Sequence, residues 1–152
     1  MSVRIVVLDA GPLGLAASPA RTQAALSCQR WVAALEAAGA QIVVPEIADY
    51  EVRRELLLAG KTASVARLDL LKARSTYLPI STAVVLHAAD LWAQARRAGV
   101  PTADRHALDC DVILAAQALS IGAPAGGIAV ATGNAVHVSR YVTSARWEDI
   151  RP

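Results

Sequence analysis

Three carboxylates occupy comparable places beside the predicted strands of this chain. Asp9 directly follows the apolar run at residues 5–8, which is rich in β-branched side chains and predicts a central strand buried on both faces. Glu51 falls in the first turns of the helix predicted after the second strand, and Asp111 opens the helix predicted before the last one. Ligands of parallel α/β sheets bind at the carboxyl ends of the strands. We therefore expect these three acids to meet at that edge.

Three carboxylates held together without basic partners repel one another and take up protons, and a divalent cation is the simplest way to keep them ionised. Oxygen ligands of this kind suit Mg²⁺ or Mn²⁺. Such an ion polarises a phosphodiester and lowers the pKa of a bound water, which makes the water a nucleophile. The spacing of the acids thus predicts a metal-dependent hydrolase.

Each acid also has a purely structural interpretation. An aspartate after a strand, such as Asp9, is often a turn or N-cap residue. Glu51 can pair with Arg54 on a solvated helix face, and Asp109 and Asp111 suit the first turn of a helix. Taken singly, the structural interpretation is favoured for each. Their shared place at one sheet edge is what favours the metal.

Other chemistries fit the sequence less well. The segment Gly11-Pro12-Leu13-Gly14 lacks the G-x-G-x-x-G pattern, and Gly60-Lys61-Thr62 lacks the upstream glycine of a P-loop. Gly11 stands where phosphatases with an aspartate nucleophile usually have a second aspartate. A receiver-like domain that is phosphorylated on Asp9 stays open as a third hypothesis, although no suitable lysine lies near the last predicted strand.

Length and composition predict one cytoplasmic domain over residues 1–152. Hydrophobic residues make up 55% of the chain but phenylalanine is absent, so the core must be built from valine, isoleucine, leucine and alanine. No apolar run approaches the ~20 residues that span a bilayer. Cys28 and Cys110 have no CxxC spacing. If a metal neutralises three acids, ten of the 13 acidic side chains remain against 15 basic ones, which suits a polyanionic substrate.

The hydrophobic pattern predicts alternating strands and helices. We expect strands at residues 4–9, 41–44, 76–79 and 128–132, and helices at 22–38, 47–58, 64–74, 82–97 and 109–119. Residues 11–20 and 101–108 are predicted to be loops, and the tail 133–152 to be loop with a short strand or turn near Trp147. This order indicates an α/β fold with a parallel sheet and helices on both of its faces.

The order and spacing of four segments resemble those of PIN domains, in particular the VapC-type toxin nucleases of bacterial toxin-antitoxin pairs. The segments are Val6-Val7-Leu8-Asp9 and residues 45–56, 109–118 and 131–137. The resemblance implies a PIN-like three-layer sandwich with a central parallel sheet of about four or five strands.

The resemblance also implies roles for single residues. Asp9, Glu51 and Asp111 fall on the three acids that hold the divalent metal in such proteins, and Asn134 on a polar residue that helps to shape the site. The family often has a fourth acid three residues after that position, where this chain has His137. Asp109 or Asp104 is a possible replacement, and whether one or two ions bind stays open.

The function implied is Mg²⁺- or Mn²⁺-dependent cleavage of single-stranded RNA by a homodimer. A small antitoxin protein would inhibit it by lying across the helical hairpin at residues 47–74, on a groove formed by Tyr50, Leu57, Leu58 and Leu68. Arg53 and Arg54 are candidates for contacts with RNA phosphates. The alternative is a catalytically weak PIN-like module that binds RNA or a protein.

Overall fold

The sheet is parallel throughout and has the strand order β3-β2-β1-β4-β5. The computed structural model describes residues 3–100, 104 and 109–152. Its strands are β1 (Ile5–Leu8), β2 (Gln41–Pro45), β3 (Thr76–Leu78), β4 (Ile128–Thr132) and β5 (Ser144–Arg146). The first strand lies in the centre, as its continuous apolar run predicts. The predicted α/β class is confirmed.

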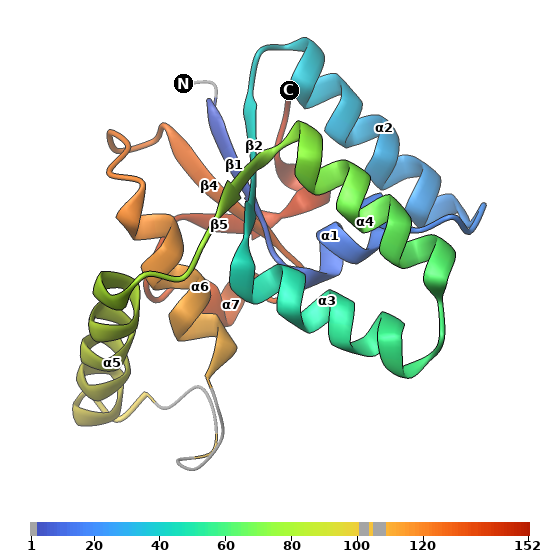
Figure 1. Cartoon of the computed structure of the whole chain (residues 1–152). Coiled ribbons are helices and arrows are strands. Elements are labelled where there is room, and N and C mark those ends of the chain that lie inside the picture. The colour runs from blue at the N-terminus through green and yellow to red at the C-terminus, as the bar shows by residue number, and fades with distance from the viewer. Residues whose placement is uncertain (1–2, 101–103, 105–108) are drawn as a thin grey trace.

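Helices cover both faces of this sheet (Figure 1). They are α1 (Ala10–Ala17), α2 (Gln23–Ala37), α3 (Glu46–Leu58), α4 (Thr62–Arg74), α5 (Thr82–Arg97), α6 (Cys110–Ser120) and α7 (Ala135–Val138), with a 3-10 turn at Trp147–Asp149. Within the described part of the chain, no helix has the length and apolar character to cross a membrane.

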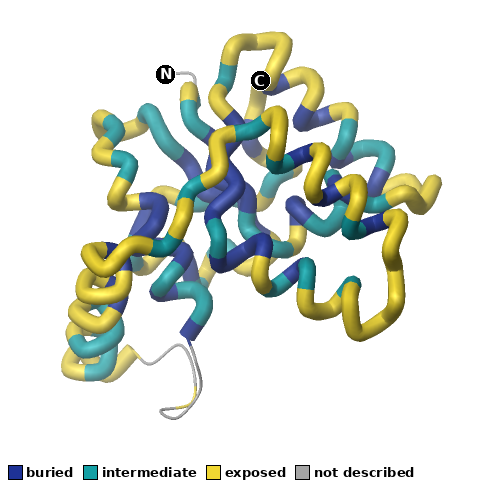
Figure 2. Tube along the Cα trace, in the orientation of Figure 1, coloured by how far each residue is buried: buried dark blue, intermediate teal, exposed yellow. Residues whose placement is uncertain are grey.

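Alternate side chains of β1 enter two different cores, because successive residues of a strand point to opposite faces. Val6 and Leu8 pack with side chains from α1, α2 and α4, whereas Val7 packs with α6 and α7. All three are fully buried. Figure 2 shows the buried sheet between helices whose outer faces are exposed. The result is the three-layer sandwich that the resemblance implies.

The segment after Asp9 was predicted to be a loop, and this prediction is wrong. Residues 10–17 form helix α1, which begins directly at the end of β1. Asp9 accepts a hydrogen bond from the backbone N–H of Ala10, and Pro12 lies in the first turn, where a helix needs no N–H from it. Gly-Pro therefore marks the start of a helix here and does not prevent one.

The carboxyl-terminal tail contains one element that was not predicted, the short helix α7 that follows β4. The short strand or turn predicted near Trp147 is confirmed, because β5 ends at Arg146, pairs in parallel with β4 and is followed by the 3-10 turn. The predicted loop at residues 101–108 lies outside the described residues except for Asp104, which is exposed.

Candidate metal centre

Asp9 is fixed at the carboxyl end of β1 by neighbours on two elements. Its Oδ1 accepts a hydrogen bond of 2.7 Å from the backbone N–H of Ala10, and its Oδ2 accepts one of 2.6 Å from the hydroxyl of Thr132 at the end of β4. Asp9 is thus the N-cap residue of α1, as its structural interpretation predicted. A carboxylate oxygen has two lone pairs, so the cap leaves acceptor capacity for a further ligand.

Glu51 on α3 and Asp111 on α6 lie close enough to Asp9 for their charges to interact. The pKa of Glu51 is raised by burial and then by repulsion from Asp9 and Asp111, while Arg54 and a hydrogen bond with Cys110 lower it. The pKa of Asp111 is raised by burial and by repulsion from Asp9 and Asp109, while His137 lowers it. Every pair among the three acids therefore repels, and the structure brings them to one edge of the sheet.

This donor set fits a hard divalent cation in its chemistry, because a cation would relieve a repulsion that Arg54 and His137 offset only in part. In the part of the chain that the structure describes, however, no three histidine, cysteine, aspartate or glutamate side chains are grouped so as to hold an ion as they stand. The side chains of Asp9, Glu51 and Asp111 must therefore turn towards an ion to share it.

The additional candidates differ in how they relate to this cluster. Asp109 is the N-cap of α6 and accepts a hydrogen bond of 3.2 Å from the backbone N–H of Val112. His137 on α7 acts electrostatically on Asp111, and its buried Nδ1 has no hydrogen-bond partner among the described residues. Asn134 is exposed and donates its backbone N–H to the hydroxyl of Thr132. Asp104 is exposed and is not among the groups that shift the pKa of Glu51 or Asp111.

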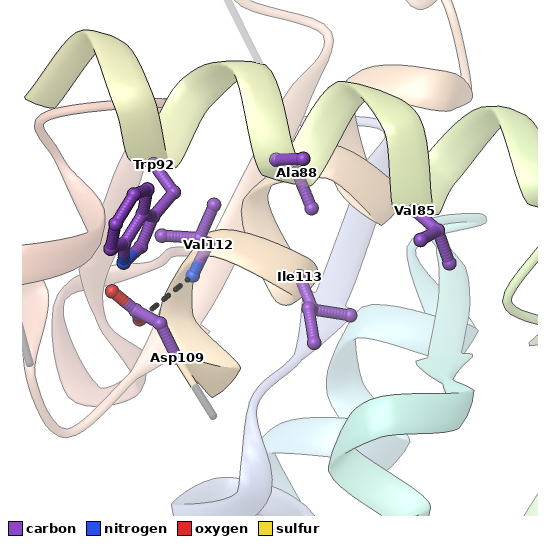
Figure 3. Close-up of a pocket in the computed structure, with 7 residues that line it drawn as sticks. Val85, Ala88, Trp92, Asp109, Val112 and Ile113 are labelled. Atoms are coloured by element: carbon purple, nitrogen blue, oxygen red, sulfur yellow. Dashed lines mark hydrogen bonds between the residues drawn. The ribbon is translucent and has the colours of Figure 1, made fainter. Parts of the chain in front are cut away.

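An apolar pocket lies between α5 and α6, with Asp109 in its wall (Figure 3). It has a volume of about 210 Å³, and its lining residues include Trp92 at one end and Val85 at the other. Its other described lining residues are Ala88, Ala89, Asp109, Val112 and Ile113. Asp109 is the acid that faces it, and this side chain already caps α6. The pocket therefore offers no set of metal ligands.

The two arginines that follow Glu51 lie in different surroundings, which the sequence does not distinguish. Arg53 donates to Asp49 at 2.9 Å and to Asp69 at 2.7 Å, so its guanidinium is already paired. Arg54 is exposed, and its charge acts on Glu51. Of the two, Arg54 is the better placed to bind a phosphate at the acidic edge, which is the edge of the sheet that carries Asp9, Glu51 and Asp111.

Asp49 is a buried residue that the sequence analysis missed. Its carboxylate accepts from Arg53 and, at 2.9 Å, from Lys72 on α4, so it joins the two helices of the hairpin. The sequence does not indicate that this aspartate is buried and paired, because the helical stretch around it is also polar. Thr132 was also missed as a partner of Asp9, although pairing of β4 with β1 would have indicated it.

Replacing Asp49 with alanine is expected to lower the free energy of unfolding by about 2 kcal/mol, because two cations lose their shared acceptor. Loss of one partner from a fully buried pair costs about 3–5 kcal/mol, and here both bases are roughly a quarter exposed and can reach water. Urea unfolding measures the change. Asp69→Ala is the matched control, since its exposed pair with Arg53 contributes at most about 0.5 kcal/mol. Equal losses in the two variants would contradict the assignment.

Replacing Asp111 with asparagine is expected to raise the melting temperature of the metal-free protein at pH 7 by about 3 °C, which is of the order of 1 kcal/mol for a chain of this size. The reason is that the folded state raises the pKa of this acid, so its ionised form destabilises folding. The advantage should shrink as the pH falls through the raised value, and vanish below the ordinary value of 3.8, where both states are protonated. Thermal melts in chelator test this. A variant that melts below the wild type at pH 7 would show that the repulsion is not significant.

Comparison with known proteins supplies independent information. A family model described as "PIN domain" matches residues 24–136. No curated protein sequence matches the chain.

Solved structures with a similar fold are complexes whose names include VapBC. VapBC2 from Rickettsia felis, bound to a DNA fragment from its promoter, gives a TM-score of 0.69 at 15% identity over 94% of this chain and 98% of the other. DNA-bound VapBC from Salmonella typhimurium gives a TM-score of 0.61 at 18% identity, over 97% of this chain and 99% of the other. VapBC-1 from nontypeable Haemophilus influenzae gives a TM-score of 0.57 at 16% identity, over 95% of this chain and 99% of the other. At these identities, the likeness shows a shared fold.

Proposed function

Because the chain belongs to the PIN domain family, we propose that it is an endoribonuclease that depends on Mg²⁺ or Mn²⁺ and acts as a single domain over residues 1–152. The observation that carries this proposal is the mutual repulsion of Asp9, Glu51 and Asp111 at one edge of the sheet. The matched range includes Glu51 and Asp111, and Asp9 joins them through the fold.

The three carboxylates would hold the ion, with Asp9 kept in place by Thr132 and by the start of α1. A bound ion supplies polarisation of the phosphodiester and a water of lowered pKa. Arg54 would bind a phosphate oxygen of the RNA, since its exposed guanidinium lies on the helix that carries Glu51. His137 stands where the family often has a fourth acid, so the stoichiometry of the metal is part of the proposal's test.

We further propose that the chain is the toxin of a toxin-antitoxin pair, that it forms a homodimer, and that it acts in the cytoplasm on RNA. Support for a small antitoxin partner comes from the VapBC complexes that share the fold and from exposed apolar residues on the α3–α4 hairpin. Leu57, Leu58 and Leu70 are 63%, 85% and 69% exposed. Leu68 was predicted to line the same groove, but it is fully buried and belongs to the core.

Incubation of the purified chain with single-stranded RNA in Mn²⁺, in Mg²⁺ and in chelator tests the enzymatic proposal. We expect cleavage with either ion and none in chelator. Cleavage that is indifferent to chelator would exclude the metal mechanism.

The alternative, a catalytically weak PIN-like module that binds RNA or a protein, is favoured by one observation: no three ligands are grouped around an ion position in the described residues. RNA affinity that is unchanged in chelator, with no cleavage under any metal, would support this alternative.

A further inference from the structure

Helix α3 presents an aromatic ring and a guanidinium together on its surface. The ring of Tyr50 is 50% exposed, and the guanidinium carbon of Arg54 lies 5.3 Å from its centroid. Residues four apart lie on one face of a helix, so the two side chains form a continuous surface. The exposed half of the ring is open to a ligand that approaches from solvent.

This pair lies directly beside the candidate metal centre. Glu51 is the residue after Tyr50, and the charge of Arg54 lowers the pKa of Glu51. Among the described residues, Arg54 has one ion pair, a long one of 3.5 Å with Glu55, and both partners are exposed. Contacts of this kind contribute little, so an incoming anion can replace Glu55.

The described residues contain two other pairs of a cation and an aromatic ring, and neither has both an exposed ring and a cation that an RNA phosphate can reach. Lys72 lies 4.5 Å from the ring centroid of Tyr77, but its ammonium already donates to the buried Asp49. Arg96 lies over Trp92 on α5, but that ring is only partly exposed and lines the pocket beside Asp109. Tyr50 and Arg54 are therefore the pair that combines an open ring, a replaceable anion and a place next to the acids.

We infer that Tyr50 and Arg54 hold one nucleotide of single-stranded RNA next to the phosphate that is cut, with the base stacked on the ring of Tyr50 and its phosphate on Arg54. This inference rests on the proposed function. Unpaired bases stack on aromatic rings and on arginine planes, and such stacking tolerates any base because every base has a π face. The guanidinium also offsets the repulsion between the RNA and the acidic edge.

A protein segment is the other class of partner for this face, and the charges favour RNA. The exposed leucines 57 and 58 lie at the far end of α3, about two turns from Tyr50. Tyr50 lies at the end of the helix where the acids gather, and its immediate neighbour on that face is a cation. An apolar partner would gain more from the leucine end of the hairpin.

The test measures binding of a fluorescently labelled single-stranded oligonucleotide to protein that carries Asp9→Asn, so that no cleavage occurs. We expect Tyr50→Leu to weaken binding about tenfold and Tyr50→Phe, which keeps the ring, to leave it almost unchanged. Arg54→Gln should reduce the dependence of log K on log salt by about 0.7, the value for one phosphate contact with a single strand. Leu86→Ala is the control, because it truncates a large side chain that is 66% exposed on α5, outside both proposed binding surfaces, and it should bind like the parent.

Oligonucleotides with one abasic position identify the stacked base. One abasic position should weaken binding to the parent protein about as much as Tyr50→Leu does, and should weaken binding to Tyr50→Leu no further. Undiminished RNA binding by Tyr50→Leu would overturn the inference and favour a protein partner on this face. An equal loss in Leu86→Ala would also overturn it, because the loss would then not depend on the ring of Tyr50.

Failure of the proposed function is distinguishable from failure of this inference. Wild type that cleaves RNA, together with a Tyr50→Leu variant that binds it normally, would refute the nucleotide contact and leave the nuclease in place. Wild type that never cleaves RNA, with binding that still depends on Tyr50, would refute the nuclease and retain the contact.

Discussion

Replacing Asp9 or Asp111 with asparagine is expected to lower the rate of RNA cleavage at least about a thousandfold while the protein stays folded. Each change removes a charged ligand, and a loss of about 4 kcal/mol of transition-state stabilisation corresponds to that factor. The fold should persist because an asparagine at position 9 can still accept from the N–H of Ala10 as an N-cap. Cleavage of labelled RNA in Mn²⁺ measures the effect, and circular dichroism reports the fold.

Asp69→Asn is the control for this experiment. It makes the same change of charge at an exposed position on α4, where the carboxylate pairs with Arg53. We expect it to cleave RNA at the wild-type rate. An Asp111→Asn variant with wild-type activity would show that the acidic edge is not the catalytic centre.

Replacing Gln117 with leucine is expected to lower the free energy of unfolding by about 3 kcal/mol. Gln117 on α6 is fully buried, its Oε1 accepts from the N–H of Ile47 at 3.2 Å, and its Nε2 donates to the carbonyl of Leu78 at 2.7 Å. Leucine would leave both backbone groups buried without a partner, at about 1–3 kcal/mol each. Urea unfolding measures the loss.

The matched control is Gln94→Leu, because Gln94 is exposed on α5 and, among the described residues, its side chain bonds only that of Asp90. We expect its stability to stay within about 0.5 kcal/mol of the wild type. A Gln117→Leu variant as stable as this control would mean that the two hydrogen bonds contribute nothing.

The role of Gln117 illustrates what the sequence could not reveal. Helix α3, which carries Glu51, follows Pro45, and proline has no side-chain oxygen to cap the helix. The cap comes instead from a helix 70 residues further along the chain. Local sequence patterns carry no information on such a partner, so the glutamine looks like any other polar residue of α6.

Elements with strong periodicity were predictable because burial alone determines them. Helix α5 and strand β4 have the predicted bounds, and the central place of β1 follows from its continuous apolar run. Helix α1 was missed because its start depends on a cap from Asp9 and on where Pro12 falls within the first turn. The hydrophobic periodicity of a sequence does not reveal a single hydrogen bond or the exact position at which a helix begins.

The acids at the sheet edge were predictable for a similar reason, since parallel strands end on one side. The arginines were not: Arg53 and Arg54 are neighbours in sequence, yet one joins the buried Asp49 and the other faces solvent. Asp9 has both roles that the sequence allowed. It caps α1 by accepting from the N–H of Ala10, and its charge repels that of Glu51.

Calorimetric titration of Mn²⁺ into the wild type and into Asp111→Asn tests the central claim most directly. The claim is that Asp9, Glu51 and Asp111 form a metal site, and it predicts heat of binding for the wild type that disappears in the variant. The stoichiometry also shows whether one or two ions bind. A folded wild type that binds no Mn²⁺, or an Asp111→Asn variant that binds it with equal affinity, would contradict the claim.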